Sequence, residues 1–433
     1  MKINESSSAA FVRIFFIFVV ICYAVLFLVN PQLSPSDEYA FLPTLQSGKF
    51  FPMYGDEFTY YNSVELGRFG PLGGQEYNIV ALFTSDPIGY FLLNAIEFLI
   101  ITIVLVKILN EYSANKVLNY VIVLLLFTMP AFTNTFFKIL YVEKNVIFLL
   151  ALFLYSFITF QKKQKILWLV MSVIFANLAI YYKEPVFIAI GIFSAGHLLF
   201  SWKTAGNRKK VLDGLLIASA AVYATVYLVT VFPNKVHALP GASGDVFSLL
   251  GFLKTIMNYC FFSDPIIMLV AVPLAIWRLY QVFIRCLAPD PVLDPMLGAL
   301  TCYVAVFFVL NLYSPYYFLP AYIFAFPPIV YFVLNERVIG RFWKSAFAVC
   351  SFVLIVNTIP LGIHYLTYNK YLPVNFNNTL DFLISDIDRR YNGDRINLFM
   401  DGVDRGTGRG IYFVVGEFLK FKGLSIRKFD LKT

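Results

Sequence analysis

Two adjacent carboxylates follow the first long apolar run of the chain. Asp37 and Glu38 stand about seven residues beyond it, next to Ser34-Pro35-Ser36, a typical helix start. A carboxylate at the edge of an apolar phase can stay ionised while partly desolvated, which suits a general base. The same pair could hold a divalent cation such as Mg²⁺ or Mn²⁺. The alternative is structural, with Ser36 or Asp37 capping the helix and Glu38 in its favourable first turn.

Two short segments between later apolar runs combine Lys, Glu and Tyr. The first contains Tyr141, Glu143 and Lys144, and the second is Tyr181-Tyr182-Lys183-Glu184-Pro185. A Lys at such a position can hold a phosphate ester, and a Glu can orient it or help to hold a metal. The alternative is interfacial anchoring by Tyr and by Lys side chains that reach back to water.

Two further groups carry polar atoms in apolar surroundings. Tyr316 and Tyr317 lie in an uncharged turn that is typical of an aromatic belt but could also stack on a sugar or an isoprenoid chain. Asn94 and Glu97 are spaced i, i+3 inside the second apolar run. A polar contact between helices is the expected role for them, because no second carboxylate is expected at comparable depth.

Composition places all these residues in a membrane protein. Of 433 residues, 59% are hydrophobic and 14% charged, against roughly 45–50% and about 25% in soluble domains. A soluble fold of this size cannot bury so much apolar surface, so we expect an all-α polytopic membrane protein. The net charge of +8 comes from short loops and from the tail after Tyr365. That distribution excludes a nucleic-acid-binding groove.

Eleven apolar runs approach the length of about 20 residues that a membrane span needs. We place them at 10–30, 87–106, 117–132, 145–160, 166–182, 186–200, 211–232, 265–284, 296–312, 319–334 and 345–365. Three of them (145–160, 186–200 and 319–334) are short enough to be tilted, broken or re-entrant. The first has basic residues before it and no small-residue cleavage site after it, which predicts an uncleaved signal anchor.

Basic residues in alternate loops predict the orientation. One set of loops carries sixteen Lys and Arg and the other set seven, so the N-terminus is expected in the cytoplasm. With an odd number of spans, the tail after Tyr365 then lies outside. Apart from Asn94 and Glu97, the candidate residues described above fall in outer loops or at the outer ends of spans.

Two domains are expected from this layout. Residues 1–365 form the membrane domain, whose outer loop 31–86 has seven acidic residues against Lys49 and Arg68 and enough apolar residues for amphipathic surface helices. Residues 366–433 alternate helical and strand patterns and predict a small outer α/β module.

The outer loops resemble those of the GT-C superfamily of membrane glycosyltransferases, which use polyprenyl-phosphate sugars. Size and layout are most similar to the serotype-converting O-antigen glucosyltransferases carried by bacteriophages. The motifs that carry the resemblance are Asp37-Glu38, Gly67-Arg68-Phe69-Gly70-Pro71-Leu72, Tyr-Val-Glu at 141–143, Tyr-Lys-Glu-Pro at 182–185 and Tyr-Tyr-Phe-Leu-Pro at 316–320.

The resemblance implies inverting transfer of a hexose, glucose first among them, from a polyprenyl-phosphate donor to O-antigen or another surface glycan. The reaction would take place on the outer face of a bacterial inner membrane, with the C-terminus in the periplasm. Asp37 would be the base, and the leaving phosphate would be held by Lys183 or Arg68, with Lys144 as a third cation. Glu38 and Glu143 would orient the acceptor or hold a divalent cation. The substrates would also be oriented by Glu184, Tyr141, Tyr182, Tyr316 and Tyr317.

Two alternatives stay open at this point. An O-antigen polymerase would resemble this layout but is expected to have arginine-rich outer loops, whereas loops 31–86 and 233–264 contain only Arg68. A lipid or solute transporter or flippase predicts charged groups near the middle of the membrane and paired broken helices. Asn94 and Glu97 answer that description, but the other charges concentrate in the outer loops.

Overall fold

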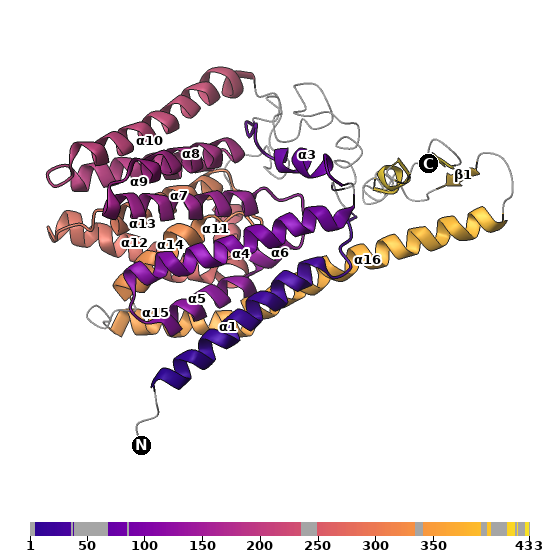
Figure 1. Ribbon diagram of the computed structural model, residues 1–433, viewed down its shortest axis with the longest axis horizontal. Helices are drawn as coiled ribbons and strands as arrows, with labels where there is room; N and C mark the ends of the chain where they lie inside the picture. Colours follow the sequence, from indigo (N-terminus) through magenta and orange to yellow (C-terminus); the bar gives the residue numbers. More distant parts are fainter. Residues whose placement is uncertain are drawn as a thin grey trace.

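The structure is a computed structural model that describes residues 5–35, 38, 68–84, 86–234, 249–333, 341–390, 396–399, 414–420, 422 and 429–432. The described helices pack side by side into a bundle along the long axis of the molecule (Figure 1). In chain order they are α1 (Glu5–Leu28), α3 (Gln75–Ala81), α4 (Pro87–Tyr112), α5 (Lys116–Thr128), α6 (Pro130–Phe136), α7 (Glu143–Lys163), α8 (Ile166–Tyr182), α9 (Pro185–Ser201), α10 (Asn207–Val226), α11 (Leu249–Asn258), α12 (Val272–Leu279), α13 (Leu293–Val309), α14 (Ala321–Pro328), α15 (Arg341–Val353) and α16 (Ile359–Arg390). π-Helical turns extend several of them, as at Tyr227–Val231 and Ile266–Ala271.

The chain is a multi-pass helical membrane protein. Among the described residues, six helical segments are long and apolar enough to cross a membrane, or seven if one bent pair counts as a span. The six are Ala10–Leu28, Pro87–Tyr112, Glu143–Lys163, Asn207–Asn234, Ile266–Ile284 and Ser345–Ile387. The four other predicted spans coincide with apolar helices of 10–17 residues, so a total of eleven stays a prediction.

Two of the predicted spans differ in form from their sequence pattern. The span predicted at 117–132 is broken, because α5 and α6 meet at 63° with Pro130 as the first residue of α6. A proline has no backbone N–H and disfavours continuation of the preceding helix. The run predicted as short at 145–160 is instead a helix of 21 residues, since Glu143, Lys144 and the final lysines also belong to α7.

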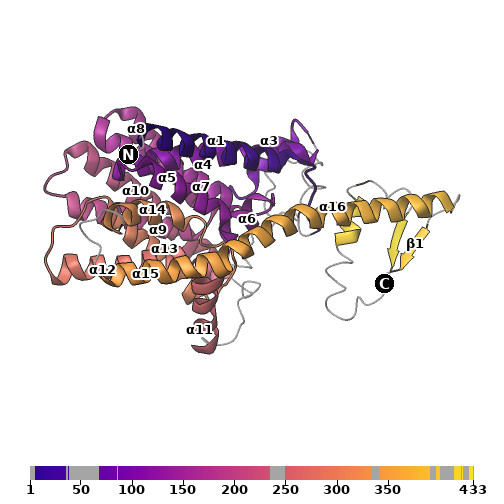
Figure 2. The same cartoon turned by 90° about the horizontal axis from the view of Figure 1, so that it is seen from below.

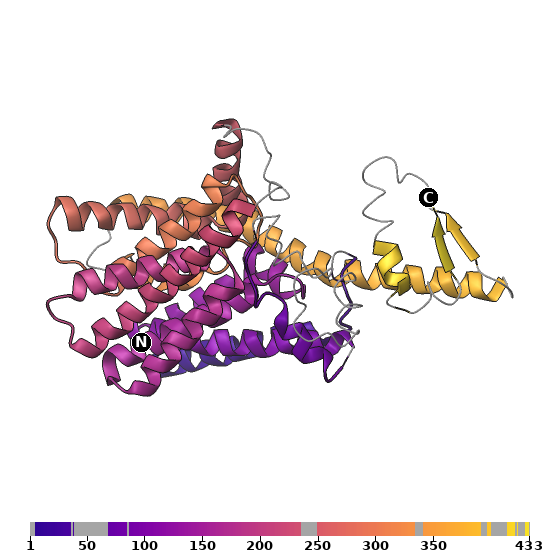
Figure 3. The same ribbon diagram turned by 90° about the horizontal axis from the view of Figure 1, so that it is seen from above.

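The end of the bundle at α3 is called the outer end here, following the predicted orientation. It lies opposite the N-terminus of the chain, and α16 extends beyond it (Figures 1 and 2). The helix α4 begins there with the Asp86 side chain accepting a hydrogen bond from the Ile88 N–H at 2.9 Å and with Pro87 in its first turn. The amphipathic helix α11 stands away from the bundle (Figure 3). Most of loop 31–86, where surface helices are expected, lies outside the described residues.

The C-terminal elements lie along the far part of α16. This helix runs through residue 365 without a break. Strands β1 (Ile396–Phe399) and β2 (Phe429–Lys432) pair in parallel, with Ile396 opposite Phe429. The helix at 414–420 lies between them in the chain, and its buried Phe418 packs edge-on against Phe376 of α16. The described elements therefore follow the order α-β-α-β.

Gly362 provides a test of how α16 packs on the bundle. A Cβ atom there would collide with the backbone carbonyl oxygen of Thr128, at the end of α5. We expect Gly362→Ala to destabilise the protein by about 1–3 kcal/mol, the usual cost of overpacking. In Gly214→Ala on α10 the new Cβ meets open space, so this control should be neutral or stabilising by about 0.5–1 kcal/mol. Thermal unfolding in detergent measures both, and equal effects would contradict the packing described here.

Candidate active site

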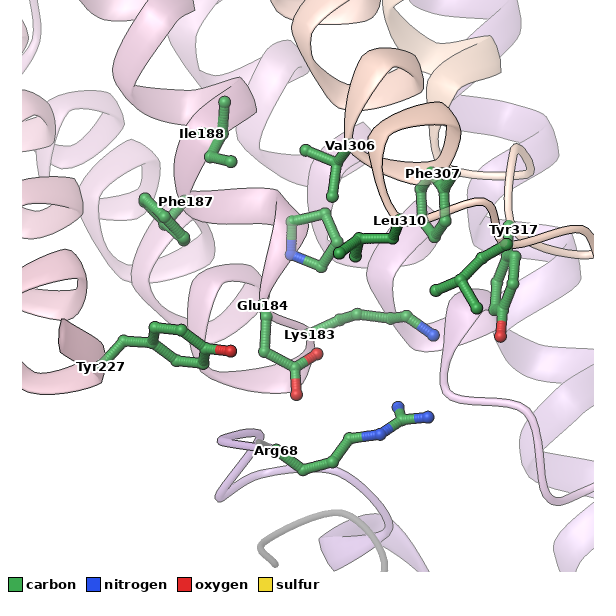
Figure 4. A pocket seen from close by; sticks show the side chains of 12 residues that line it. Arg68, Lys183, Glu184, Phe187, Ile188, Tyr227, Val306, Phe307, Leu310 and Tyr317 are labelled. Atoms are coloured by element: carbon green, nitrogen blue, oxygen red, sulfur yellow. The ribbon is translucent and has the colours of Figure 1, made fainter. Parts of the chain in front are cut away.

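A pocket of about 210 Å³ opens at the outer end of the bundle, between the α8–α9 turn and α13. Its polar side chains gather on one side, and its apolar side chains form the rest of the wall (Figure 4). The polar group comprises Arg68, Lys183, Glu184, Tyr227 and Tyr317. The apolar group comprises Pro185, Phe187, Ile188, Val306, Phe307, Leu310 and Leu312. The sequence-predicted residues Arg68, Lys183, Glu184 and Tyr317 are thus brought together from three separate segments.

Phe69 anchors the segment that carries Arg68. Its backbone N–H donates to Glu184 Oε1 at 3.0 Å, and its carbonyl oxygen accepts a hydrogen bond from the Tyr223 hydroxyl. Its ring packs against Tyr181 and Tyr223, at centroid distances of 6.5 and 5.4 Å. The neighbouring Arg68 is thereby held beside the α8–α9 turn, and Figure 4 shows its guanidinium on the same side of the pocket as the Lys183 amine.

Lys183 is held by a buried ion pair with Glu143, the first residue of α7. The pair joins the start of α7 to the two-residue turn between α8 and α9. Lys183 also lies over the ring of Tyr317, 5.0 Å from its centroid, in a cation–π contact. Both contacts restrict the long lysine side chain, so its charge is presented at a defined place in the pocket wall.

Three sequence-predicted tyrosines form a stack next to the ion pair. The rings of Tyr141 and Tyr316 stack with centroids 4.0 Å apart, and Tyr316 meets Tyr317 edge-on at 4.8 Å. The ring of Tyr317 also stacks on Phe307, with centroids 4.7 Å apart. Burial and the nearby Glu143 carboxylate raise the pKa of the Tyr316 hydroxyl, so it stays a neutral hydrogen-bonding group. This wall can stack against a sugar ring or a prenyl chain.

Lys144, Tyr182 and Glu38 lie outside the residues that line this pocket. The Lys144 ammonium is fully buried and donates to the carbonyl oxygens of Ile139 at 2.7 Å and Lys138 at 3.4 Å. Tyr182 donates its hydroxyl to Glu76 Oε2 at 3.0 Å. The Lys144 contacts hold the turn before α7, and the Tyr182 contact joins α8 to α3.

Glu38 is buried and accepts two backbone hydrogen bonds. Ser34 N–H donates to Oε2 at 2.6 Å, and Ile139 N–H donates to Oε1 at 2.9 Å. Burial raises the pKa of Glu38, while these hydrogen bonds and the nearby lysines act in the opposite direction. The arrangement connects the end of α1 to the turn before α7, which is a positioning role.

Asp37 lies outside the described residues, and its role as the base stays a proposal. Among the residues that the structure describes, no three His, Cys, Asp or Glu side chains gather as a metal site. A divalent cation at Asp37 and Glu38 therefore stays a sequence-based expectation.

Several site residues were not predicted from the sequence. Tyr223 lies near the outer end of α10 and Tyr227 begins its π-helical extension. Phe187 and Phe307 belong to the apolar wall of the pocket. The i, i+4 spacing of Tyr223 and Tyr227 places them on one helix face and was a usable signal. The two phenylalanines look like any other apolar residue of a span, so their spacing carries no signal.

Comparisons with known proteins give a match among solved structures but none among family models or curated proteins. Among solved structures, the chain is similar to the crystal structure of ArnT from Cupriavidus metallidurans bound to undecaprenyl phosphate. The identity is 15%, the match covers 95% of this chain and 76% of that chain, and the TM-score is 0.44. A similarity of this degree leaves the function to be argued from the site itself.

The Lys183–Glu143 pair can be tested by a double-mutant cycle. Lys183→Met leaves Glu143 as a buried charge without its partner, and Glu143→Leu does the same to Lys183. Each single change should cost about 3–5 kcal/mol of unfolding free energy, and the double variant should recover most of that loss. Unfolding in detergent gives the coupling energy. Simple addition of the two losses would show that the side chains do not interact.

Proposed function

We propose that the chain is a GT-C-type glycosyltransferase that moves a hexose from a polyprenyl-phosphate donor onto a surface glycan on the outer face of the membrane. The observation that supports this is the pocket in which Arg68 and Lys183 lie beside apolar walls from α9 and α13. Such a combination fits an amphiphile with an anionic head and a hydrocarbon chain.

Arg68 and Lys183 would bind the donor phosphate. A guanidinium and an ammonium both donate charge-assisted hydrogen bonds to phosphate oxygens, and the guanidinium can do so with two N–H groups. Ile188, Val306 and Leu310 line the adjoining wall and would contact the first isoprene units. Glu184 also lines the pocket, and its carboxylate would accept hydrogen bonds from sugar hydroxyls.

The reaction would proceed by inversion at the anomeric carbon. Asp37 would accept the proton of an acceptor hydroxyl, whose oxygen attacks the anomeric carbon as the bond to the phosphate oxygen breaks. The lipid phosphate leaves with the electron pair of that bond, and Arg68 and Lys183 stabilise its charge. Glu38 is the weaker candidate for the base, because both of its oxygens already accept backbone hydrogen bonds.

The acceptor would approach from the aqueous side of the tyrosine stack. Tyr141, Tyr316 and Tyr317 would offer faces and hydroxyls to a glycan such as O-antigen. Glucose is the hexose that the sequence resemblance favours. The transporter alternative is less well supported, because the pocket's charged residues come from turns at one end of the bundle.

Transfer by purified protein in liposomes tests the function, using labelled polyprenyl-phosphate hexoses and polysaccharide acceptors. Arg68→Gln should raise the KM for the donor about 10–100-fold, because one charge-assisted contact worth about 1.5–3 kcal/mol is lost. Asp37→Asn should lower kcat about 10²–10⁴-fold.

Arg285→Gln is the matched control for the loss of a guanidinium. Arg285 is exposed, follows the π-helical extension of α12, and donates to the Tyr280 hydroxyl at 2.9 Å. Arg285→Gln should leave the KM for the donor and kcat unchanged. Absence of transfer from every donor by folded wild-type protein would refute the proposed function, and chain-length and flux assays would then test the polymerase and transporter alternatives.

A further inference from the structure

A second cavity of about 290 Å³ lies between α3, α4, α7 and α8 and shares no lining residue with the pocket around Arg68. Three of its polar lining residues are Glu76, Glu97 and Asn145. They come from three different helices and are 8%, 4% and 3% exposed. The sequence predicted a contact between helices for Glu97, and Asn145 Nδ2 does donate to Glu97 Oε1 at 3.0 Å. The expected absence of a second carboxylate at that depth was wrong, because Glu76 lines the same cavity.

Each of these three side chains keeps one oxygen without a hydrogen-bond partner. Glu76 Oε2 accepts a hydrogen bond from the Tyr182 hydroxyl, and Glu97 Oε1 accepts one from Asn145 Nδ2. The unpaired atoms are Glu76 Oε1, Glu97 Oε2 and Asn145 Oδ1, and all three are hydrogen-bond acceptors. Buried acceptors usually have donor partners, so a ligand with N–H donors would fit this lining.

The charge around the cavity favours a ligand with one positive charge. Lys144 lies near four acids, Glu38, Glu76, Glu97 and Glu143. Glu143 is paired with Lys183 and Glu38 also lies near Lys138, so the group has one acid more than it has lysines. Lys144 directs its hydrogen bonds to the carbonyl oxygens of Ile139 and Lys138 rather than into the cavity. Burial raises the pKa of Glu76, and the opposing effects of Lys144, of its own backbone N–H and of the Tyr182 and Tyr77 hydroxyls offset that increase only in part. A monovalent cation would complete the balance, whereas a divalent ion would exceed it.

The remaining walls are apolar. Phe148 and Leu149 of α7 line the cavity, as do Ile79 of α3 and Leu178 of α8. Ile79 is 53% and Leu178 36% exposed, so these two residues also form part of the outer surface of the bundle. A metal ion gains no favourable contact from apolar side chains, whereas an organic cation with an apolar part can pack against them.

We propose that this cavity binds a primary ammonium group, supplied by the aminated headgroup of a bilayer lipid. The three N–H donors of an ammonium match the three unpaired oxygens in number, and its single charge matches the excess acid. The lipid's hydrocarbon part would lie against Ile79 and Leu178 at the bundle surface. The ligand differs in charge from the one proposed for the Arg68–Lys183 pocket, and its binding does not depend on the proposed function.

Binding can be measured on the full-length protein in detergent. Phosphatidylethanolamine should raise the unfolding temperature by several degrees over phosphatidylcholine, whose quaternary ammonium has no N–H, and over phosphatidylglycerol. Glu76→Gln/Glu97→Gln should abolish that difference. Glu111→Gln, which removes an exposed carboxylate at the other end of α4, should retain it.

Native mass spectrometry of the wild-type protein serves as a second measurement that needs no variant. In equimolar mixtures, phosphatidylethanolamine should be retained about tenfold over phosphatidylcholine, a ratio that one or two charge-assisted hydrogen bonds can supply. Equal retention would overturn the proposal, as would an undiminished lipid effect in the double variant. Equal protection by soluble ethanolamine would overturn the lipid as the source, and protection by MgCl₂ alone would replace the ammonium by a metal ion.

Discussion

The ion pair between Lys183 and Glu143 is the interaction on which the outer end of the bundle depends. Both groups are buried, and in such surroundings a charge without its partner is strongly destabilising. The pair therefore holds the start of α7 against the α8–α9 turn and leaves the lysine at the pocket wall beside Arg68. Under the proposed function, a phosphate bound there would meet the Arg68 guanidinium and a Lys183 ammonium that the ion pair has already positioned.

The same turn separates two cavities whose linings carry different charged groups. Lys183 has extended backbone at the end of α8, so it lines the Arg68 pocket, while the preceding Tyr182 binds Glu76 and lines the second cavity. The proposed ligands are an anion for the first cavity and a cation for the second. Leu178 and Tyr182 of α8 line only the second cavity, and the first begins at the α8–α9 turn.

Hydropathy and turn composition predicted the positions of the helices and the loops that carry charge. Most predicted spans coincide with helices because a run of apolar residues is a local property. Which charges pair is not local. Glu143-Lys144 and Lys183-Glu184 look alike in the sequence, yet Lys183 reaches across to Glu143 while Lys144 binds backbone carbonyls. Glu76 lines the same cavity as Glu97 because α3 packs beside α4 and α7. The spacing of residues in the sequence does not predict that packing.

The most direct test of the central claim is photolabelling of the protein with a photoactivatable polyprenyl phosphate, followed by mapping of the labelled residues by mass spectrometry. Labelling is expected on α9 and α13, around Ile188, Val306 and Leu310, with competition by unlabelled polyprenyl phosphate and not by the matching polyprenol. Labelling that avoids both helices, or equal competition by the uncharged alcohol, would contradict a phosphate held by Arg68 and Lys183.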